Sequence, residues 1–159
     1  MWYFRNSVRV NQGKNPLTIE EAFDNFSKGI SVYGPYWDHV MSYWKESLEK
    51  PEKVFVLKYE DMKEQPTIYL KKLAEFLECP FSREEEVKGV INDILRLYSF
   101  ENLSNLEVNK NGKILMLVNK AALFRRGEAE NWKNHLTAEM SETLDRITEE
   151  KFHNVGLKF

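Results

Sequence analysis

A short apolar run, Val54–Leu57, constrains the fold more than any other feature of this 159-residue chain. Polar and charged residues flank the run on both sides, at 52–53 and at 58–61. Such a run is typical of a strand buried on both faces, as in a parallel sheet covered by helices. Because a single strand cannot pair its own backbone groups, it needs neighbouring strands. We therefore predict an α/β fold with one buried parallel-type strand at about 54–58.

Most of the remaining sequence predicts helices. Capping boxes at Thr18 and Ser82 each precede an apolar stripe, which ends at Gly29 in the first case and continues to Leu95 in the second. Further stripes run from Trp37 to Leu48, from Pro66 to near Cys79-Pro80, and from Thr137 to Phe152, and Ser99 can cap a short turn. No capping residue precedes the aromatic-rich segment 1–10, to which we assign no element.

The strands that would pair with the predicted strand are not evident in the sequence, and this has two interpretations. Ile114–Val118 is a second apolar run and could pair with it, although this run lies in the Asn- and Lys-rich segment 105–131. The simpler interpretation is that the chain is the carboxyl-terminal part of a larger α/β domain. We expect segment 105–131 to be functional, because long loops inside compact domains usually are.

Composition narrows the function classes. Acidic residues number 25 and basic residues 23, for a net charge of −2, which disfavours a nucleic-acid partner. The single cysteine, Cys79, cannot form an intrachain disulfide, and no Cys/His grouping has zinc-ligand spacing, so we expect no metal. No stretch approaches the roughly 20 apolar residues of a membrane span. We therefore expect a cytoplasmic protein without a membrane partner, and the sequence does not indicate an oligomeric state.

The most informative chemistry lies in Arg125-Arg126-Gly127. Two guanidinium groups can each donate paired hydrogen bonds to phosphate oxygens. A glycine lets its backbone amide approach the same anion. Phe124 and Trp132 could supply apolar walls beside an adenine. The alternative is that the Arg-Arg-Gly run is an ordinary solvated turn.

Four motifs in order along the chain resemble the cytosolic sulfotransferases, and the flavonol-type plant branch most closely. They are residues 33–40 (YGPYWDHV), 57–63 (LKYEDMK), 99–103 (SFENL) and 124–127 (FRRG) with 132–134 (WKN). The resemblance implies transfer of a sulfuryl group from 3'-phosphoadenosine 5'-phosphosulfate (PAPS) to a hydroxyl of a small flavonoid or steroid-like acceptor. It also implies a P-loop-like α/β domain, of which residues 1–159 would be a part without the amino-terminal phosphosulfate-loop half.

Carried onto this sequence, the resemblance assigns the 3'-phosphate of PAPS to Arg125, Arg126 and Gly127, which match the family's Arg-Lys-Gly. The sequence departs from the pattern at Arg126, where the charge is kept but the ammonium geometry is not. It departs again at 130–132, where Glu-Asn-Trp stands in place of Gly-Asp-Trp. The second departure puts the turn of this loop in question.

The same resemblance assigns the adenine contacts to Tyr59, Ser99 and Phe100, and a place in the acceptor pocket to Phe4. Tyr98 is bulkier than the family's small polar residue at that position, so its adenine contact is in doubt. The alternative for Tyr59 is a tyrosine that only packs at a strand end. The alternative for Phe4 is core packing.

No catalytic residue is assigned. The family's Lys-Ser-Gly-Thr-Thr-Trp pattern is not found in the 159 residues, and His39, His135 and His153 do not match its general-base histidine. We expect His39 to be a packed side chain and the isolated chain to be inactive. One alternative is a non-catalytic remnant that binds 3'-phosphoadenosine nucleotides or pairs with a full-length homologue. A weaker alternative is a helical interaction module.

Overall fold

The computed structural model describes residues 2–114, 118–128 and 130–157. Their contacts divide the chain into two compact units. Residues 3–14, 57–114 and 118–128 form the first unit, and residues 2, 15–56 and 130–157 form the second. The arginine loop, residues 124–127, therefore lies in the first unit together with the motifs at 57–63 and 99–103.

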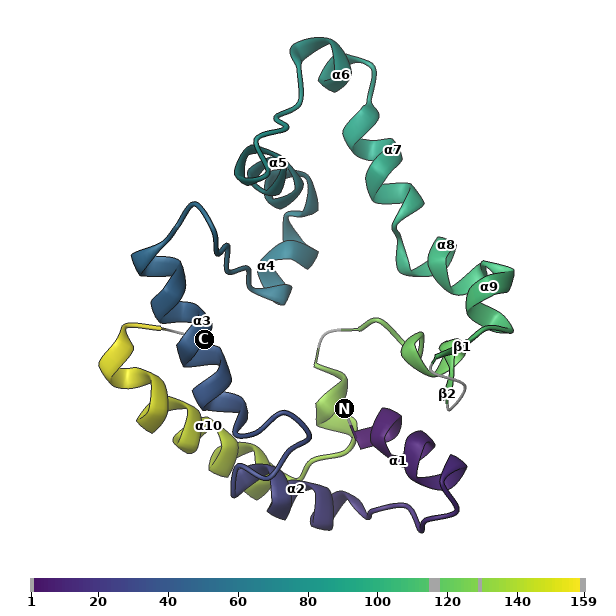
Figure 1. Cartoon of the computed structure of the whole chain (residues 1–159), viewed down its shortest axis with the longest axis vertical. Coiled ribbons are helices and arrows are strands. Elements are labelled where there is room, and N and C mark those ends of the chain that lie inside the picture. Colours follow the sequence, from purple (N-terminus) through teal and green to yellow (C-terminus); the bar gives the residue numbers. More distant parts are fainter. Residues whose placement is uncertain (1, 115–117, 129, 158–159) are drawn as a thin grey trace. The chain divides into compact units, whose positions relative to one another are not determined.

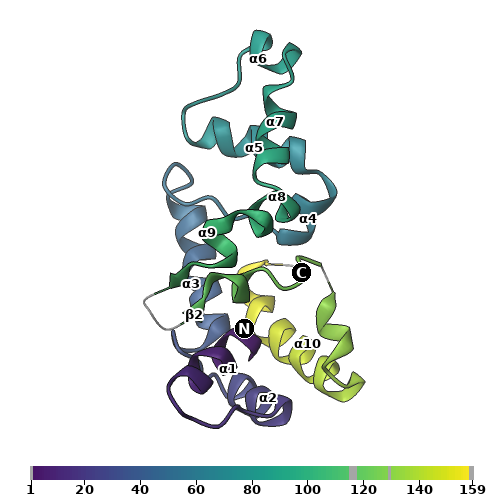
Figure 2. The same cartoon turned by 90° about the vertical axis from the view of Figure 1, so that its right-hand side faces the viewer.

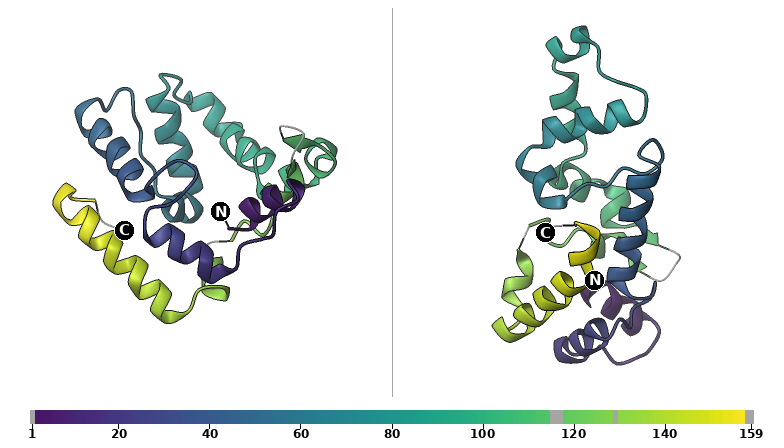
Figure 3. Two further views of the ribbon diagram at one scale, coloured as in Figure 1. Left: turned by 60° about the horizontal axis from the view of Figure 1, so that its bottom comes forward. Right: turned by 90° about the vertical axis from the view of Figure 1, so that its left-hand side faces the viewer.

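The second unit is a group of helices around an aromatic core. Its elements are α2 (Ile19–Ser27), α3 (Tyr36–Glu49), η2 (Asn131–Asn134), α10 (Ala138–Phe152) and η3 (His153–Val155). Helix α10 packs along α2 and α3 (Figures 1 and 3). Trp37, Phe152 and Leu157 are buried between them, with exposed fractions of 3%, 1% and 8%. The predicted amphipathic helix from Trp37 to Leu48 is confirmed, with its aromatic face covered by α10.

The indole N–H groups of Trp37 and Trp44 in this core both donate hydrogen bonds. Trp37 Nε1 donates to Thr148 Oγ1 at 2.9 Å, and Trp44 Nε1 donates to the Val155 carbonyl oxygen at 2.8 Å. A buried donor without a partner costs about 1–3 kcal/mol, so these two bonds remove a penalty that an aromatic core would otherwise carry.

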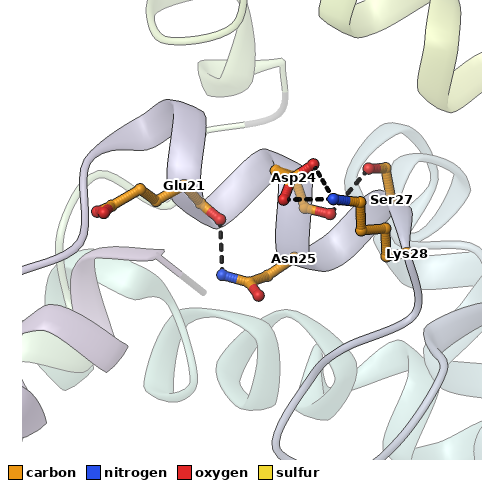
Figure 4. Close-up of polar contacts among 5 residues, drawn as sticks. All are labelled: Glu21, Asp24, Asn25, Ser27 and Lys28. Carbon is orange, nitrogen blue, oxygen red and sulfur yellow. Dashed lines mark hydrogen bonds and ion pairs between the residues drawn. The ribbon is translucent and has the colours of Figure 1, made fainter.

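Helix α2 begins at the predicted capping box. The Thr18 hydroxyl accepts a hydrogen bond from the Glu21 amide at 3.1 Å, and the Glu21 carboxylate accepts one from the Thr18 amide at 2.9 Å. Further along, Asn25 Nδ2 donates to the Glu21 carbonyl oxygen at 2.7 Å, and Lys28 forms an ion pair with Asp24 at 2.7 Å (Figure 4). These exposed contacts are local, so the sequence alone could indicate this helix.

The described part of the first unit consists of short helices and two short strands (Figure 2). Its elements are α1 (Trp2–Asn11, of which Trp2 belongs to the second unit), α4 (Tyr59–Glu64), α5 (Pro66–Phe76), α6 (Arg83–Val87), α7 (Val90–Leu97), α8 (Phe100–Asn105), α9 (Glu107–Lys110), β1 (Lys113–Ile114), β2 (Val118–Asn119) and η1 (Lys120–Leu123). Helix α5 packs on α7, and α9 contacts η1. Ala74 of α5 and Ile91 of α7 are buried.

The prediction of a buried parallel-type strand at 54–58 is wrong for this structure. These residues form neither strand nor helix, and Val56 is 38% exposed. In the part of the chain that the structure describes, the strands are β1 and β2, which pair antiparallel with Ile114 opposite Val118. Ile114 and Val118 therefore pair with each other and not with 54–57, whereas residues 115–117 of that run lie outside the described residues. An apolar run cannot become a sheet strand without neighbours to bond.

Two helices also differ from the prediction. Segment 2–11 forms α1 although no cap precedes it. The helix after Ser82 is divided, because Gly89 adopts a left-handed conformation (φ +78°) between α6 and α7. The capping box at Ser82 and the cap at Ser99 are confirmed.

The capping box of α6 carries a pH-dependent prediction. The Ser82 amide and hydroxyl both donate to the Glu85 carboxylate at 2.8 Å, which lowers the pKa of Glu85 below its ordinary value of 4.5. Because the folded-state pKa is lowered, this contribution to stability is complete above pH 4.5 and is lost as the pH falls through the folded-state pKa. A carboxyl NMR titration should show Glu85 below 4.5, returning toward 4.5 in Ser82→Ala. Equal values in the two proteins would contradict this interpretation.

Candidate nucleotide-binding site

Gly127 is the point at which the candidate residues of the first unit meet. It adopts a left-handed conformation with φ of +63°. A Cβ atom at this position would lie 2.5 Å from Cδ2 of Phe100, which is the first residue of α8. That distance is shorter than any real contact, so only glycine allows the arginine loop to pass this close to the Phe100 ring.

Two side chains of α4 bind the same glycine through its carbonyl oxygen. Tyr59 Oη donates to the Gly127 oxygen at 3.4 Å, and Lys63 Nζ donates to it at 3.3 Å. Tyr59 and Lys63 are four residues apart in α4 and therefore lie on one helix face. Both bonds are long, but a carbonyl oxygen has two lone pairs and can accept both donors. The arginine loop is thus connected to α4 on one side and packs against Phe100 on the other.

Helix α4 is in turn connected to α5. The Tyr69 hydroxyl of α5 donates to the Asp61 carboxylate of α4 at 3.0 Å, and this hydrogen bond raises the pKa of Tyr69. Pro66 occupies the first turn of α5, where the missing amide donor costs nothing. The position of Tyr59 and Lys63 therefore depends on an interhelical contact within the same unit.

The arginines of the loop are exposed, and aromatic rings lie beside them. The Arg125 guanidinium carbon lies 4.2 Å from the ring centroid of Tyr3, on α1. Phe124 packs against Phe100 with ring centroids 6.0 Å apart and an interplanar angle of 57°. The loop consequently presents two permanent positive charges next to an aromatic pair, a combination suited to an anionic group attached to a flat ring.

Ser99 has a local structural role. Its hydroxyl accepts a hydrogen bond from the Asn102 amide at 3.1 Å and so caps α8. The cap sets the start of the helix from which Phe100 reaches Gly127. Phe100 remains 38% exposed, and the preceding Tyr98 is exposed as well.

The structure brings together Tyr59, Phe100 and Gly127 among the predicted site residues, with Arg125 and Arg126 adjacent in the loop. Phe4 lies half-buried on α1 of the same unit. Sequence reasoning missed Lys63 and Tyr3. The i, i+4 spacing from Tyr59 could have pointed to Lys63. No local signal connects Tyr3 with Arg125, because these residues lie far apart in the sequence.

Other kinds of site receive no support from the described residues. Among them, no group of three or more His, Cys, Asp or Glu side chains could hold a metal ion. His39 lies edge-on to Tyr43 with ring centroids 5.1 Å apart, but both residues are exposed, so the expectation of a packed histidine is wrong. A search of these residues for a helix of sufficient length and apolarity to cross a bilayer finds none.

Comparison with known proteins identifies the family. The model of the sulfotransferase domain matches residues 1–156, so the chain belongs to the sulfotransferase domain family. Cytosolic sulfotransferase 11 of Arabidopsis thaliana is 48% identical over 158 residues, which cover 99% of this chain and 45% of that protein. Flavonol 4'-sulfotransferase of Flaveria chlorifolia is 53% identical over 141 residues, which cover 87% of this chain and 44% of that protein. The chain thus spans less than half the length of these relatives.

A solved structure shares the fold. A mouse sulfotransferase complexed with PAP superposes with a TM-score of 0.73 at 25% sequence identity, covering 97% of this chain and 54% of the mouse chain. The fold of this chain is therefore that of part of a sulfotransferase.

Proposed function

We propose that this chain is part of a PAPS-dependent cytosolic sulfotransferase and that the arginine loop binds the 3'-phosphate of PAPS. The observation that carries the proposal is the position of Gly127. It lies between Phe100 and the two α4 donors, so close to the Phe100 ring that no Cβ atom fits. Such a constraint next to two exposed arginines is expected of a loop that binds an anion at a defined distance from a ring.

The roles of the individual residues follow from this arrangement. Arg125 and Arg126 bind phosphate oxygens with their guanidinium groups, and the backbone of Gly127 approaches the same phosphate. Phe100 and Tyr59 lie on two sides of this glycine and contact the adenine ring. Ser99 contributes through the cap of α8, and Phe4 lines the acceptor pocket.

In the complete reaction, an acceptor hydroxyl attacks the sulfur of PAPS and the nucleotide bisphosphate departs. The 159 residues bind and orient the nucleotide. The general base and the phosphosulfate loop belong to parts of the family pattern that this sequence does not contain, and no metal takes part. The acceptor is a small hydroxylated molecule, flavonoid or steroid-like. Residues 1–159 act as part of one P-loop-like α/β domain.

A second candidate function is nucleotide binding without transfer. The residues assigned to the phosphate and the adenine all lie in the first unit. A chain with these residues alone can bind 3'-phosphoadenosine nucleotides, by itself or paired with a full-length homologue. Sulfuryl transfer by the chain as given would exclude this candidate.

Calorimetry with 3',5'-adenosine bisphosphate tests the nucleotide site. We expect saturable binding, weakened about tenfold by Arg125→Ala, because a charge-assisted hydrogen bond contributes about 1.5 kcal/mol. Arg96→Ala is the matched control, since Arg96 is an exposed arginine of the same unit paired only locally with Asp93 at 2.9 Å. Binding that Arg125→Ala leaves unchanged would refute the assignment of the arginine loop, and absence of binding would refute the nucleotide site.

A further inference from the structure

We propose that Tyr3 is a positioning residue for Arg125, and that its ring increases the selectivity of the site for nucleotides with a 3'-phosphate. The inference rests on the proposed function of the arginine loop. The Arg125 guanidinium lies 4.2 Å from the Tyr3 ring centroid, well within the range of about 6 Å in which an aromatic face attracts a cation.

The geometry leaves Arg125 able to bind an anion. A guanidinium group that stacks on a ring uses its flat face, whereas its N–H donors point outward in the plane of the group. Stacking on Tyr3 is therefore compatible with hydrogen bonds from the edge of Arg125 to a phosphate. The Arg125 side chain can therefore contact the Tyr3 ring and bind a phosphate at the same time.

The contact with Tyr3 restricts the Arg125 side chain before the ligand binds, and this favours the affinity. A long arginine side chain loses rotamer freedom when it binds a ligand, and this loss weakens the affinity. Tyr3 is itself 40% exposed on α1 and belongs to the same unit as the loop. Its ring confines the guanidinium in advance, while Lys63 and Tyr59 confine the carbonyl of Gly127 two residues later.

The test compares 3',5'-adenosine bisphosphate with AMP, which has no 3'-phosphate, by calorimetry on the full chain. Tyr3→Leu should weaken binding of the bisphosphate about two- to fivefold, as expected for an exposed cation–π contact, and leave AMP unchanged. Tyr3→Phe keeps the aromatic face and should retain the wild-type selectivity. Tyr43→Leu, at an exposed helical tyrosine outside the site, is the matched control.

Several outcomes would overturn the inference. Equal weakening of both nucleotides by Tyr3→Leu would indicate a merely structural role, and a loss in Tyr3→Phe as large as in Tyr3→Leu would exclude the ring face. No change in Tyr3→Leu would exclude any role.

An NMR measurement separates this inference from the proposed function. A guanidinium stacked on a ring shifts the Arg125 δ-proton resonances upfield. The shift should persist in Tyr3→Phe and vanish in Tyr3→Leu. If the wild-type chain binds neither nucleotide, the proposed function fails, whereas this shift still decides whether Tyr3 positions Arg125.

Discussion

Replacement of Phe152 by alanine is expected to destabilise the second unit by about 3–5 kcal/mol, the usual cost of removing a fully buried phenylalanine. Phe152 is 1% exposed and lies in one cluster with Trp37 and Leu157. The cavity cannot close easily, because Trp37 is fixed by its hydrogen bond to Thr148. Since marginal domains have only about 5–15 kcal/mol of stability, this change should leave a large unfolded population at 37 °C.

The measurement is urea denaturation followed by tryptophan fluorescence. All 4 tryptophans of the chain belong to the second unit, so the signal reports on that unit. Tyr33→Ala is the control, because this aromatic residue of the same unit is 84% exposed and should change the midpoint little. A Phe152→Ala protein with the same midpoint as Tyr33→Ala would show that the described core does not determine stability.

Replacement of Gly127 by alanine is expected to weaken binding of 3',5'-adenosine bisphosphate by about a hundredfold. A left-handed conformation costs a residue with a Cβ about 1–2 kcal/mol, and displacement of a packed neighbour costs about 1–3 kcal/mol more. The new methyl group would lie 2.5 Å from Phe100 Cδ2, so either the loop or the ring must move. Both movements disturb the proposed site, because the loop carries the arginines and Phe100 contacts the adenine.

Gly13→Ala is the control for backbone strain outside the arginine loop. Gly13 has a similar φ of +71°, but a Cβ there would meet no atom within 4 Å. The control protein should therefore carry the backbone strain without the collision and bind the nucleotide like the wild type. Calorimetry and thermal unfolding on both proteins provide the comparison. Wild-type affinity in Gly127→Ala would contradict the proposed site.

The local features of this protein could be predicted from its amino-acid sequence. The capping boxes at Thr18 and Ser82 each begin a helix, as predicted. The apolar spacing from Trp37 to Leu48 defines an amphipathic helix that the structure confirms. These predictions succeed because capping bonds and helical faces depend on residues three or four positions apart. The order of the family motifs likewise sufficed to identify a sulfotransferase domain.

The contacts between distant segments could not be predicted in this way, because they depend on the tertiary structure. Val54–Leu57 has the composition of a buried strand, but without neighbouring strands it stays irregular, since a strand is defined by its partners. In the same way, the Arg125 guanidinium lies on the Tyr3 ring, and the Gly127 carbonyl receives the donors of α4. The residues next to each partner in the sequence do not specify these contacts. The partners meet because α1, α4 and α8 fold around the arginine loop.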